Sequence, residues 1–261
     1  GKKGTTLKAE GDTALLSRRL ALIDINVAFP KDHNFFSLKS FDKDALIRFY
    51  QTMSFNSLIK EIQSAVSEVE DDLSYTLVDS EESFLSLKEH LKKAQDIAFH
   101  VELTSEKPMW AQILGIGFST REKEGLYIPF NGKLGKMRAL AMVQEIFSLN
   151  GYFFSHNAKQ AMIALKNEGI EIEVSFDTIL ASSLLNSNER QHSLEALAIK
   201  YFGLTKKSIT ELTGKGKNEI SIETAPIEKV MEYCAQASDF TFRLKERFQK
   251  EIEERGLHSV C

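Results

Sequence analysis

The hydrophobic pattern of this chain changes its period near residue 73, and this change constrains the fold most strongly. Upstream, apolar residues recur at helical spacing, whereas downstream they form short β-prone runs separated by turn residues. Beyond the last of these runs the pattern is almost entirely helical. Strands followed by helices predict an α/β fold in which helices cover a mixed sheet. The expected strands are Tyr75–Val78, Ile97–Leu103, Ile113–Ser119, Leu126–Phe130 and Tyr152–Ser155.

The last predicted helix is the clearest single element. It follows Pro226, a residue that is tolerated in the first turn of a helix, and it ends at Arg255-Gly256. Between these points apolar residues recur every three or four positions, which predicts a long helix with one buried face. The residues of this stripe are Ile227, Val230, Cys234, Ala237, Phe240, Leu244, Phe248 and Ile252.

The upstream part is predicted to be a separate helical segment. Residues 1–66 show helical periodicity, which Phe29-Pro30 interrupts. Residues 67–73 are acidic and poor in apolar residues, so we expect a linker there. The predicted organisation is a small helical segment at 1–66, a linker at 67–73 and an α/β domain at 74–261.

Composition excludes several classes of protein. The chain has 261 residues, and 33 Lys+Arg against 37 Asp+Glu give a net charge of −4, which is ordinary for a globular protein and weighs against strong binding to nucleic acid. The two cysteines, Cys234 and Cys261, exclude a disulfide framework. No apolar run is long enough for a membrane span and no signal peptide opens the chain, so we expect a cytoplasmic protein without a membrane partner. Because the chain begins at Gly1 without Met, we expect a fragment of a longer protein.

Two residues on one predicted strand attract attention as a candidate site. His100 and Glu102 are two positions apart, so their side chains lie on the same face. A zinc deaminase would also need a Pro-Cys-x-x-Cys motif, which the sequence lacks. Cys234 is expected to be an inert buried thiol, and Trp110 is expected in the core.

The order and spacing of several segments over about 185 residues resemble a known family. That family is the 3′–5′ exonuclease, or proofreading, domain of the bacterial DNA polymerase I (family A) enzymes, and the resemblance implies a ribonuclease-H-like fold. Residues 1–66, particularly Leu16–Ala21, resemble the tail of the preceding 5′-nuclease domain. The segments that carry the resemblance to the exonuclease domain are Ile97–Glu102, Tyr127–Pro129, Asn157–Leu165, Phe176–Thr178, Leu184–Ser187, Ser193–Ala198, Gly214–Asn218 and the segment around Tyr233.

The resemblance also indicates that the metal site has degenerated. Family members hold two metal ions about 3.5–4 Å apart with four carboxylates. At the three aspartate positions this chain has His100, Ala161 and Ala237, while Glu102 and Tyr233 remain. Asp239 is two residues beyond Ala237 and points about 200° away on the helix, so it is a poor replacement. We therefore expect no catalytic residue, no bound metal and no cofactor in this fragment, and Mg²⁺ would serve the polymerase domain.

Three hypotheses for function follow. The leading one is a non-catalytic exonuclease-like scaffold between the nuclease and polymerase domains of a DNA polymerase I, whose partner is DNA. A second keeps weak metal-dependent exonuclease activity through His100, Glu102 and Asp239. A third is a module that binds single-stranded DNA without cleaving it, for which the candidate residues are Lys159, Lys206, Lys207, Lys215 and Lys217.

Overall fold

The computed structural model describes residues 2–28, 30, 32–38, 40, 42–65, 73–216 and 219–257. The chain forms two compact units, residues 1–42 and residues 43–261. The N-terminal unit contains the helices α1 (Lys2–Ala9) and α2 (Gly11–Ala21) and the 3₁₀ turn η1 (His33–Phe36), and no residue of α2 is buried. Among the described residues, no helix has both the length and the apolar content to cross a bilayer.

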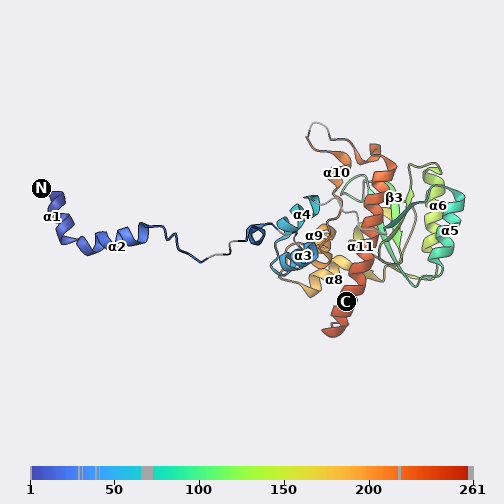
Figure 1. Cartoon of the computed structure of the whole chain (residues 1–261). Helices are drawn as coiled ribbons and strands as arrows, with labels where there is room; N and C mark the ends of the chain where they lie inside the picture. Colours follow the sequence, from blue (N-terminus) through green and yellow to red (C-terminus); the bar gives the residue numbers. More distant parts are fainter. Residues whose placement is uncertain are drawn as a thin grey trace. The chain divides into compact units, whose positions relative to one another are not determined.

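The C-terminal unit has the predicted mixed sheet with helices on both faces (Figure 1). Its strands are β1 (Ser74–Leu77), β2 (Asp96–Leu103), β3 (Ile113–Ser119), β4 (Glu124–Pro129), β5 (Tyr152–Ser155) and β6 (Phe176–Asp177). Its helices are α3 (Lys43–Thr52), α4 (Asn56–Ala65), α5 (Glu81–Leu91), α6 (Gly135–Phe147), α7 (Ala158–Asn167), α8 (Thr178–Leu185), α9 (Leu194–Phe202), α10 (Ile209–Thr213) and α11 (Ile227–Glu254), and a 3₁₀ turn, η3 (Ile222–Thr224), precedes α11.

The sheet has the strand order β1-β4-β3-β2-β5-β6. Strands β2, β3 and β4 pair antiparallel, whereas β1 pairs with β4, β5 with β2, and β6 with β5 in parallel. The prediction of an α/β fold with a mixed sheet is therefore confirmed. The two-residue strand β6 is an element that the sequence pattern did not reveal.

Strand β2 divides its side chains between the two faces of the sheet. Ile97, Phe99 and Val101 belong to the large hydrophobic core that also contains residues of α5 and α6. Ala98 faces the other side, where it packs with Phe242 of α11. This alternation is the period-2 geometry of a strand, and it places His100 on the α11 face with Ala98. Figure 1 shows α5 and α6 on one side of the sheet and α11 on the other.

Helix α11 lies very close to the sheet because glycines face it. A Cβ atom added to Gly117 of β3 would lie 2.8 Å from the carbonyl oxygen of Cys234. One added to Gly125 of β4 would lie 2.5 Å from the Cβ atom of Ala235. Both distances are below van der Waals contact, so any larger residue at either position would push α11 away from the sheet.

Asp239 fixes α11 to the β1 and β4 side of the sheet. This aspartate is fully buried, and its carboxylate accepts hydrogen bonds from the Tyr75 hydroxyl at 3.0 Å and the Lys123 backbone amide at 2.8 Å. Arg243, one turn along the helix, donates to it from Nε at 2.8 Å and from an Nη atom at 2.6 Å. Burial nevertheless raises the pKa of Asp239, because desolvation outweighs these favourable contacts.

Residues 43–65 pack on the α/β part of the chain. The side-chain amide of Gln51 in α3 donates to the backbone oxygen of Ile199 in α9 at 3.2 Å. A Cβ atom at Gly203, just after α9, would lie 2.5 Å from a methyl carbon of Ile47. The structure thus separates residues 1–42 from α3 and α4, which the sequence analysis grouped as residues 1–66. Residues 67–72 of the predicted linker 67–73 lie outside the described part of the chain.

One core prediction was wrong. Trp110 lies in the turn between β2 and β3, and its side chain is 84% exposed. The prediction relied on residue type alone, that is, on the tendency of large aromatic side chains to be buried. An aromatic side chain in a connecting turn can remain exposed to solvent. Phe240 and Phe248 of α11 are 1% and 0% exposed, and the predicted stripe is buried except for Ile227. Burial is not confined to one face, however, because all residues from 237 to 244 are buried.

We expect Phe248→Ala to lower the free energy of unfolding by about 3–5 kcal/mol, because the lost ring leaves a cavity in a closed core. Leu180→Ala is the control, since Leu180 of the adjacent helix α8 is 67% exposed and should cost under about 0.5 kcal/mol. Denaturant unfolding of both variants measures the difference. Equal losses would show that α11 does not close this core.

We expect Asp239→Asn to lower the free energy of unfolding by about 3–5 kcal/mol, because the buried guanidinium of Arg243 loses its carboxylate. Glu171→Gln is the matched control, since Glu171 pairs with Lys166 at 3.1 Å but their side chains are 79% and 72% exposed. Breaking that surface pair should cost about 0–1 kcal/mol. A loss below about 1 kcal/mol in Asp239→Asn would contradict the anchoring role of this carboxylate.

Candidate functional site

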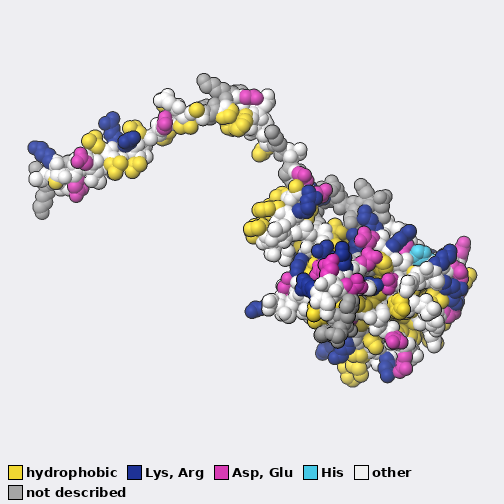
Figure 2. Space-filling view, turned by 90° about the horizontal axis from the view of Figure 1, so that it is seen from below, with side chains coloured by type: hydrophobic (Ala, Val, Ile, Leu, Met, Phe, Trp, Pro, Cys, Tyr) yellow, Lys and Arg dark blue, Asp and Glu magenta, His cyan; other side chains and the backbone are white. Residues whose placement is uncertain are grey.

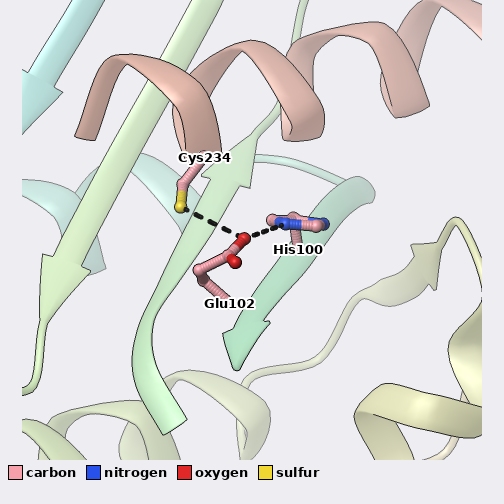
Figure 3. Close-up of side chains that lie close together, drawn as sticks. All are labelled: His100, Glu102 and Cys234. Carbon is pink, nitrogen blue, oxygen red and sulfur yellow. Dashed lines mark hydrogen bonds and ion pairs between the residues drawn. The ribbon is translucent and has the colours of Figure 1, made fainter. Parts of the chain in front are cut away.

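His100 and Glu102 form the centre of the candidate site (Figure 3). The distance between His100 Nε2 and a carboxylate oxygen of Glu102 is 3.0 Å. This is hydrogen-bond distance, and an Nε2–H group of the imidazole can donate to the carboxylate oxygen. Glu102 is 7% exposed, and a buried carboxylate requires such a donor.

Cys234 approaches the same carboxylate from α11. Its thiol donates a long hydrogen bond to Glu102, with Sγ 3.9 Å from the oxygen that His100 also contacts. One oxygen of Glu102 thus lies between an imidazole and a thiol (Figure 3). The thiol is fully buried, and this burial raises the pKa of Cys234 well above its usual value.

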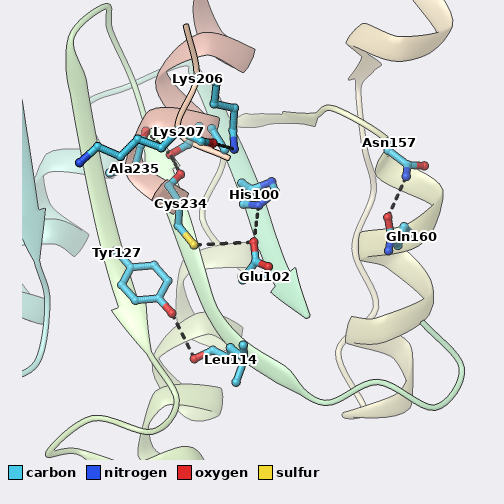
Figure 4. A network of polar contacts seen from close by, with 12 residues as sticks. His100, Glu102, Leu114, Tyr127, Asn157, Gln160, Lys206, Lys207, Cys234 and Ala235 are labelled. Atoms are coloured by element: carbon cyan, nitrogen blue, oxygen red, sulfur yellow. Dashed lines mark hydrogen bonds and ion pairs between the residues drawn. The ribbon is translucent and has the colours of Figure 1, made fainter. Parts of the chain in front are cut away.

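A buried lysine adds a positive charge beside this cluster (Figure 4). Lys206 Nζ lies 3.2 Å from the centre of the Tyr233 ring and 3.6 Å from Glu195, and its side chain is only 2% exposed. Burial lowers the pKa of Lys206, while Glu195 and Glu102 act in the opposite direction. The ring of Tyr233 in turn meets the edge of the His100 ring, with 6.4 Å between centroids. Burial also raises the pKa of Tyr233.

The two alanines that the family resemblance places in the site are core residues. Ala161 of α7 is 5% exposed and belongs to the large core with Ala164 and Leu165. Ala237 of α11 is 0% exposed and packs with Phe240 and other residues of the core beneath α8 and α9. Neither position offers an oxygen atom to a metal ion.

Asp239 does not join the cluster. Its carboxylate is engaged by Tyr75, Lys123 and Arg243 at the β1 side of the sheet, as described above. Across the described residues, the group of possible metal ligands that come together consists of His100, Glu102 and Cys234. The sequence-based expectation that Asp239 is a poor replacement ligand therefore agrees with its contacts.

Asp177 organises the helix start next to the site. Its carboxylate accepts from the backbone amide of Ala158 at 2.8 Å and from that of Ile179 at 2.9 Å, so it caps both α7 and α8. Asn157 occupies the cap position of α7 with a positive φ of 61°, but its side chain donates to Gln160 instead. His156 bonds Thr178 at 2.8 Å, and burial lowers the pKa of His156 to about 4.

The five lysines proposed for DNA binding differ in their surroundings. Lys206 is buried, and Lys207 forms an ion pair with Glu232. Lys159 on α7 and Lys215 after α10 are exposed, whereas Lys217 lies outside the described residues. On the face shown in Figure 2, basic and acidic side chains intermingle over the C-terminal unit. The structure thus does not unite these lysines in one exposed basic row.

A cavity of about 1390 Å³ lies beside the site without containing it. Its lining includes residues of α3, α9 and α11, and Lys206 and Lys207 contribute to its wall. Acidic residues, among them Asp44 and Glu232, line it as well. His100, Glu102 and Cys234 do not line this cavity; the His100 side chain is 22% exposed, whereas Glu102 and Cys234 are buried.

The sequence analysis did not predict that Cys234 lies in this cluster or that Lys206 lies beside it. Cys234 was predicted to be an inert thiol, and its proximity to Glu102 depends on how closely α11 approaches β3. The glycine at position 117, directly opposite His100 in the register of β2 and β3, is the signal that could have indicated this contact. Lys206 was predicted as a surface residue for DNA, and the sequence carries no sign of its burial.

Comparison with solved structures supports the fold. The catalytic core of RRP6 from Trypanosoma brucei matches 72% of this chain and 50% of its own with a TM-score of 0.56 and 18% identity. Escherichia coli RNase D, an exoribonuclease involved in structured RNA processing, matches 71% of this chain and 47% of its own with a TM-score of 0.55 and 15% identity. The fold is thus a ribonuclease-H-like 3′–5′ exonuclease fold, as expected.

Relatives in sequence are DNA polymerases. DNA polymerase I of Pseudomonas aeruginosa is 25% identical over 97% of this chain, and that of Chloroflexus aurantiacus is 26% identical over 98%. The chain spans 30% and 32% of the length of these two relatives. The family model for the 3′–5′ exonuclease domain of DNA polymerase A matches residues 75–253. This match covers most of the chain, including nearly all of the sheet and helix α11. The chain therefore belongs to the DNA polymerase A 3′–5′ exonuclease family.

Proposed function

We propose that residues 74–261 form an exonuclease domain of a DNA polymerase I that has lost catalysis and serves as a structural scaffold. The observation that supports this proposal is the burial of Ala161 and Ala237 in hydrophobic cores. At two of the positions where the family resemblance implies metal-binding aspartates, this chain has apolar packing.

The charges around Glu102 also oppose a pair of hard cations. Mg²⁺ requires oxygen ligands, and two Mg²⁺ ions need several carboxylates to offset their charge. The cluster contains a single carboxylate, Glu102, together with an imidazole and a thiol. The buried ammonium of Lys206 adds repulsion. These residues do not fit a two-magnesium site.

The scaffold role concerns a longer protein. Relatives that cover this chain are about three times as long and are DNA polymerases, so we propose that this chain links the 5′-nuclease and polymerase domains of such an enzyme. DNA is then a partner of the whole enzyme, Mg²⁺ serves the polymerase domain, and the cytoplasm is its compartment. The assignment of residues 1–66 as the tail of the 5′-nuclease domain remains part of this proposal.

We expect no Mg²⁺-dependent or Mn²⁺-dependent shortening of a 5′-labelled single-stranded oligonucleotide by the 261-residue chain above an EDTA control, because Ala161 and Ala237 provide no ligand. Gel analysis beside an active 3′–5′ exonuclease measures this. Metal-dependent degradation that Glu102→Gln abolishes would show that the remaining carboxylate still supports catalysis, and it would overturn the proposal.

We expect weak binding of a single-stranded oligonucleotide that Lys159→Ala leaves unchanged, because two of the other candidate lysines are engaged within the protein. Lys166→Ala is the matched control, since Lys166 is an exposed lysine of the same helix, α7. Fluorescence anisotropy at two salt concentrations measures both affinities. If Lys159→Ala alone weakened binding and lowered the salt slope by about one unit, Lys159 would contact a phosphate and the DNA-binding hypothesis would replace the scaffold.

A further inference from the structure

We propose that His100, Glu102 and Cys234 form a binding site for a single Zn²⁺ ion. The side chains provide one nitrogen, one oxygen and one sulfur donor, the three atom types that zinc binds in proteins. The family resemblance implies oxygen ligands for two hard ions, so this donor set differs from it in kind. The sequence analysis led us to expect no bound metal. Under this proposal, that expectation holds only for hard cations such as Mg²⁺.

The three donor atoms are already close to the required separation. All three lie within 4.8 Å of one another, with 3.0 Å between His100 Nε2 and Glu102 and 3.9 Å between Cys234 Sγ and Glu102. Tetrahedral coordination by zinc places such donors about 3.3–3.6 Å apart. Shifts of about 1 Å, within reach of side-chain rotation, close the site around one ion.

The backbone holds the donors in place from two rigid elements. His100 and Glu102 share one face of β2, and Cys234 projects from α11 above it. The residue opposite His100 in the sheet is Gly117, and a Cβ atom there would lie 2.8 Å from the Cys234 carbonyl oxygen. The missing side chain therefore allows the thiol to reach the carboxylate.

Binding would exchange protons for the metal ion. The Cys234 thiol loses its proton to solvent and binds as a thiolate. The His100 ring stays neutral: its proton moves from Nε2 to Nδ1 by exchange with solvent, and the lone pair on Nε2 binds the ion. Thiolate and carboxylate together neutralise the charge of Zn²⁺. The His100 side chain is 22% exposed, so water from that side can fill the fourth position.

Lys206 is the competing cation. Its ammonium lies on the Tyr233 ring, whose helix also provides Cys234, and it interacts electrostatically with both Glu102 and Cys234. It disfavours any dication, but its charge is offset by its own partner Glu195, 3.6 Å from Nζ. One ion held by three mixed donors does not restore a pair of metals, so this site is independent of the proposed loss of catalysis.

Titration of the 261-residue chain with Co²⁺ under reducing conditions tests the proposal. We expect one equivalent to produce the near-ultraviolet charge-transfer absorption of a cobalt–thiolate bond and the intense visible bands of tetrahedral cobalt. Zn²⁺ should then displace Co²⁺ and remove both. Because the readout is spectroscopic, it is unaffected by the result of the nuclease assay.

Variants identify the ligands. Cys234→Ser should abolish the charge-transfer band. Glu102→Gln should weaken Co²⁺ binding about 10-fold or more, because even the loss of a residue that only hydrogen-bonds to a metal ligand weakens binding by about that factor. Lys206→Met should strengthen binding. The matched control is His90→Gln, because His90 forms a similar pair with Glu124 at 2.9 Å without any cysteine in that pair. Cys261→Ser controls for the second thiol.

Circular dichroism of each variant separates unfolding from the loss of a metal ligand. If Cys234→Ser does not fold, the test rests on Glu102→Gln, which preserves the shape of the side chain. The proposal is overturned if wild-type protein shows no cobalt–thiolate absorption at one equivalent. It is equally overturned if the charge-transfer band survives in folded Cys234→Ser or is lost in Cys261→Ser. An unchanged Co²⁺ affinity in Glu102→Gln would overturn it as well.

Discussion

Helix α11 lies directly on the backbone of β3 and β4, and this close approach determines the rest of the C-terminal unit. Gly117 and Gly125 make it possible, since a Cβ atom at either position would overlap the helix. Helix packing at normal distance would hold α11 a side chain's thickness above the sheet. The short distance closes the core over β2, places Cys234 within reach of Glu102, and brings Asp239 to the hydrogen-bond donors at the sheet edge.

Four residues within two turns of α11 make contacts of different kinds. Tyr233 supports the ammonium of Lys206, Cys234 contacts the strand, Ala237 packs under α8 and α9, and Asp239 anchors the helix through its ion pair. At about 100° per residue, Tyr233, Cys234 and Ala237 lie on one side of the helix, whereas Asp239 points about 200° away from Ala237. An aspartate two residues beyond an alanine thus belongs to a separate network and cannot substitute at the alanine's position.

Periodicity and resemblance together predicted the fold, but they could not predict contacts that depend on how closely the helices approach the sheet. Strand β2 was predicted within one residue, because alternation and turn residues are local signals. The environments of Lys206 and Cys234 depend on how α11 and the segment after α9 pack in three dimensions, and a lysine is expected at the surface by residue type. Trp110 is the opposite case, an aromatic residue whose turn leaves it exposed. The double cap by Asp177 joins two helices that sequence patterns treat separately.

The surroundings of Glu102 contrast with the four-carboxylate site that the family resemblance implies. Four carboxylates facing one another repel unless metal ions lie between them, whereas the single carboxylate of Glu102 is satisfied by the imidazole of His100 and lies near the ammonium of Lys206. Alanines at the two helix positions remove the remaining charges and add apolar packing. Nitrogen, oxygen and sulfur donors lie together in this cluster, and the proposed zinc site rests on that donor set.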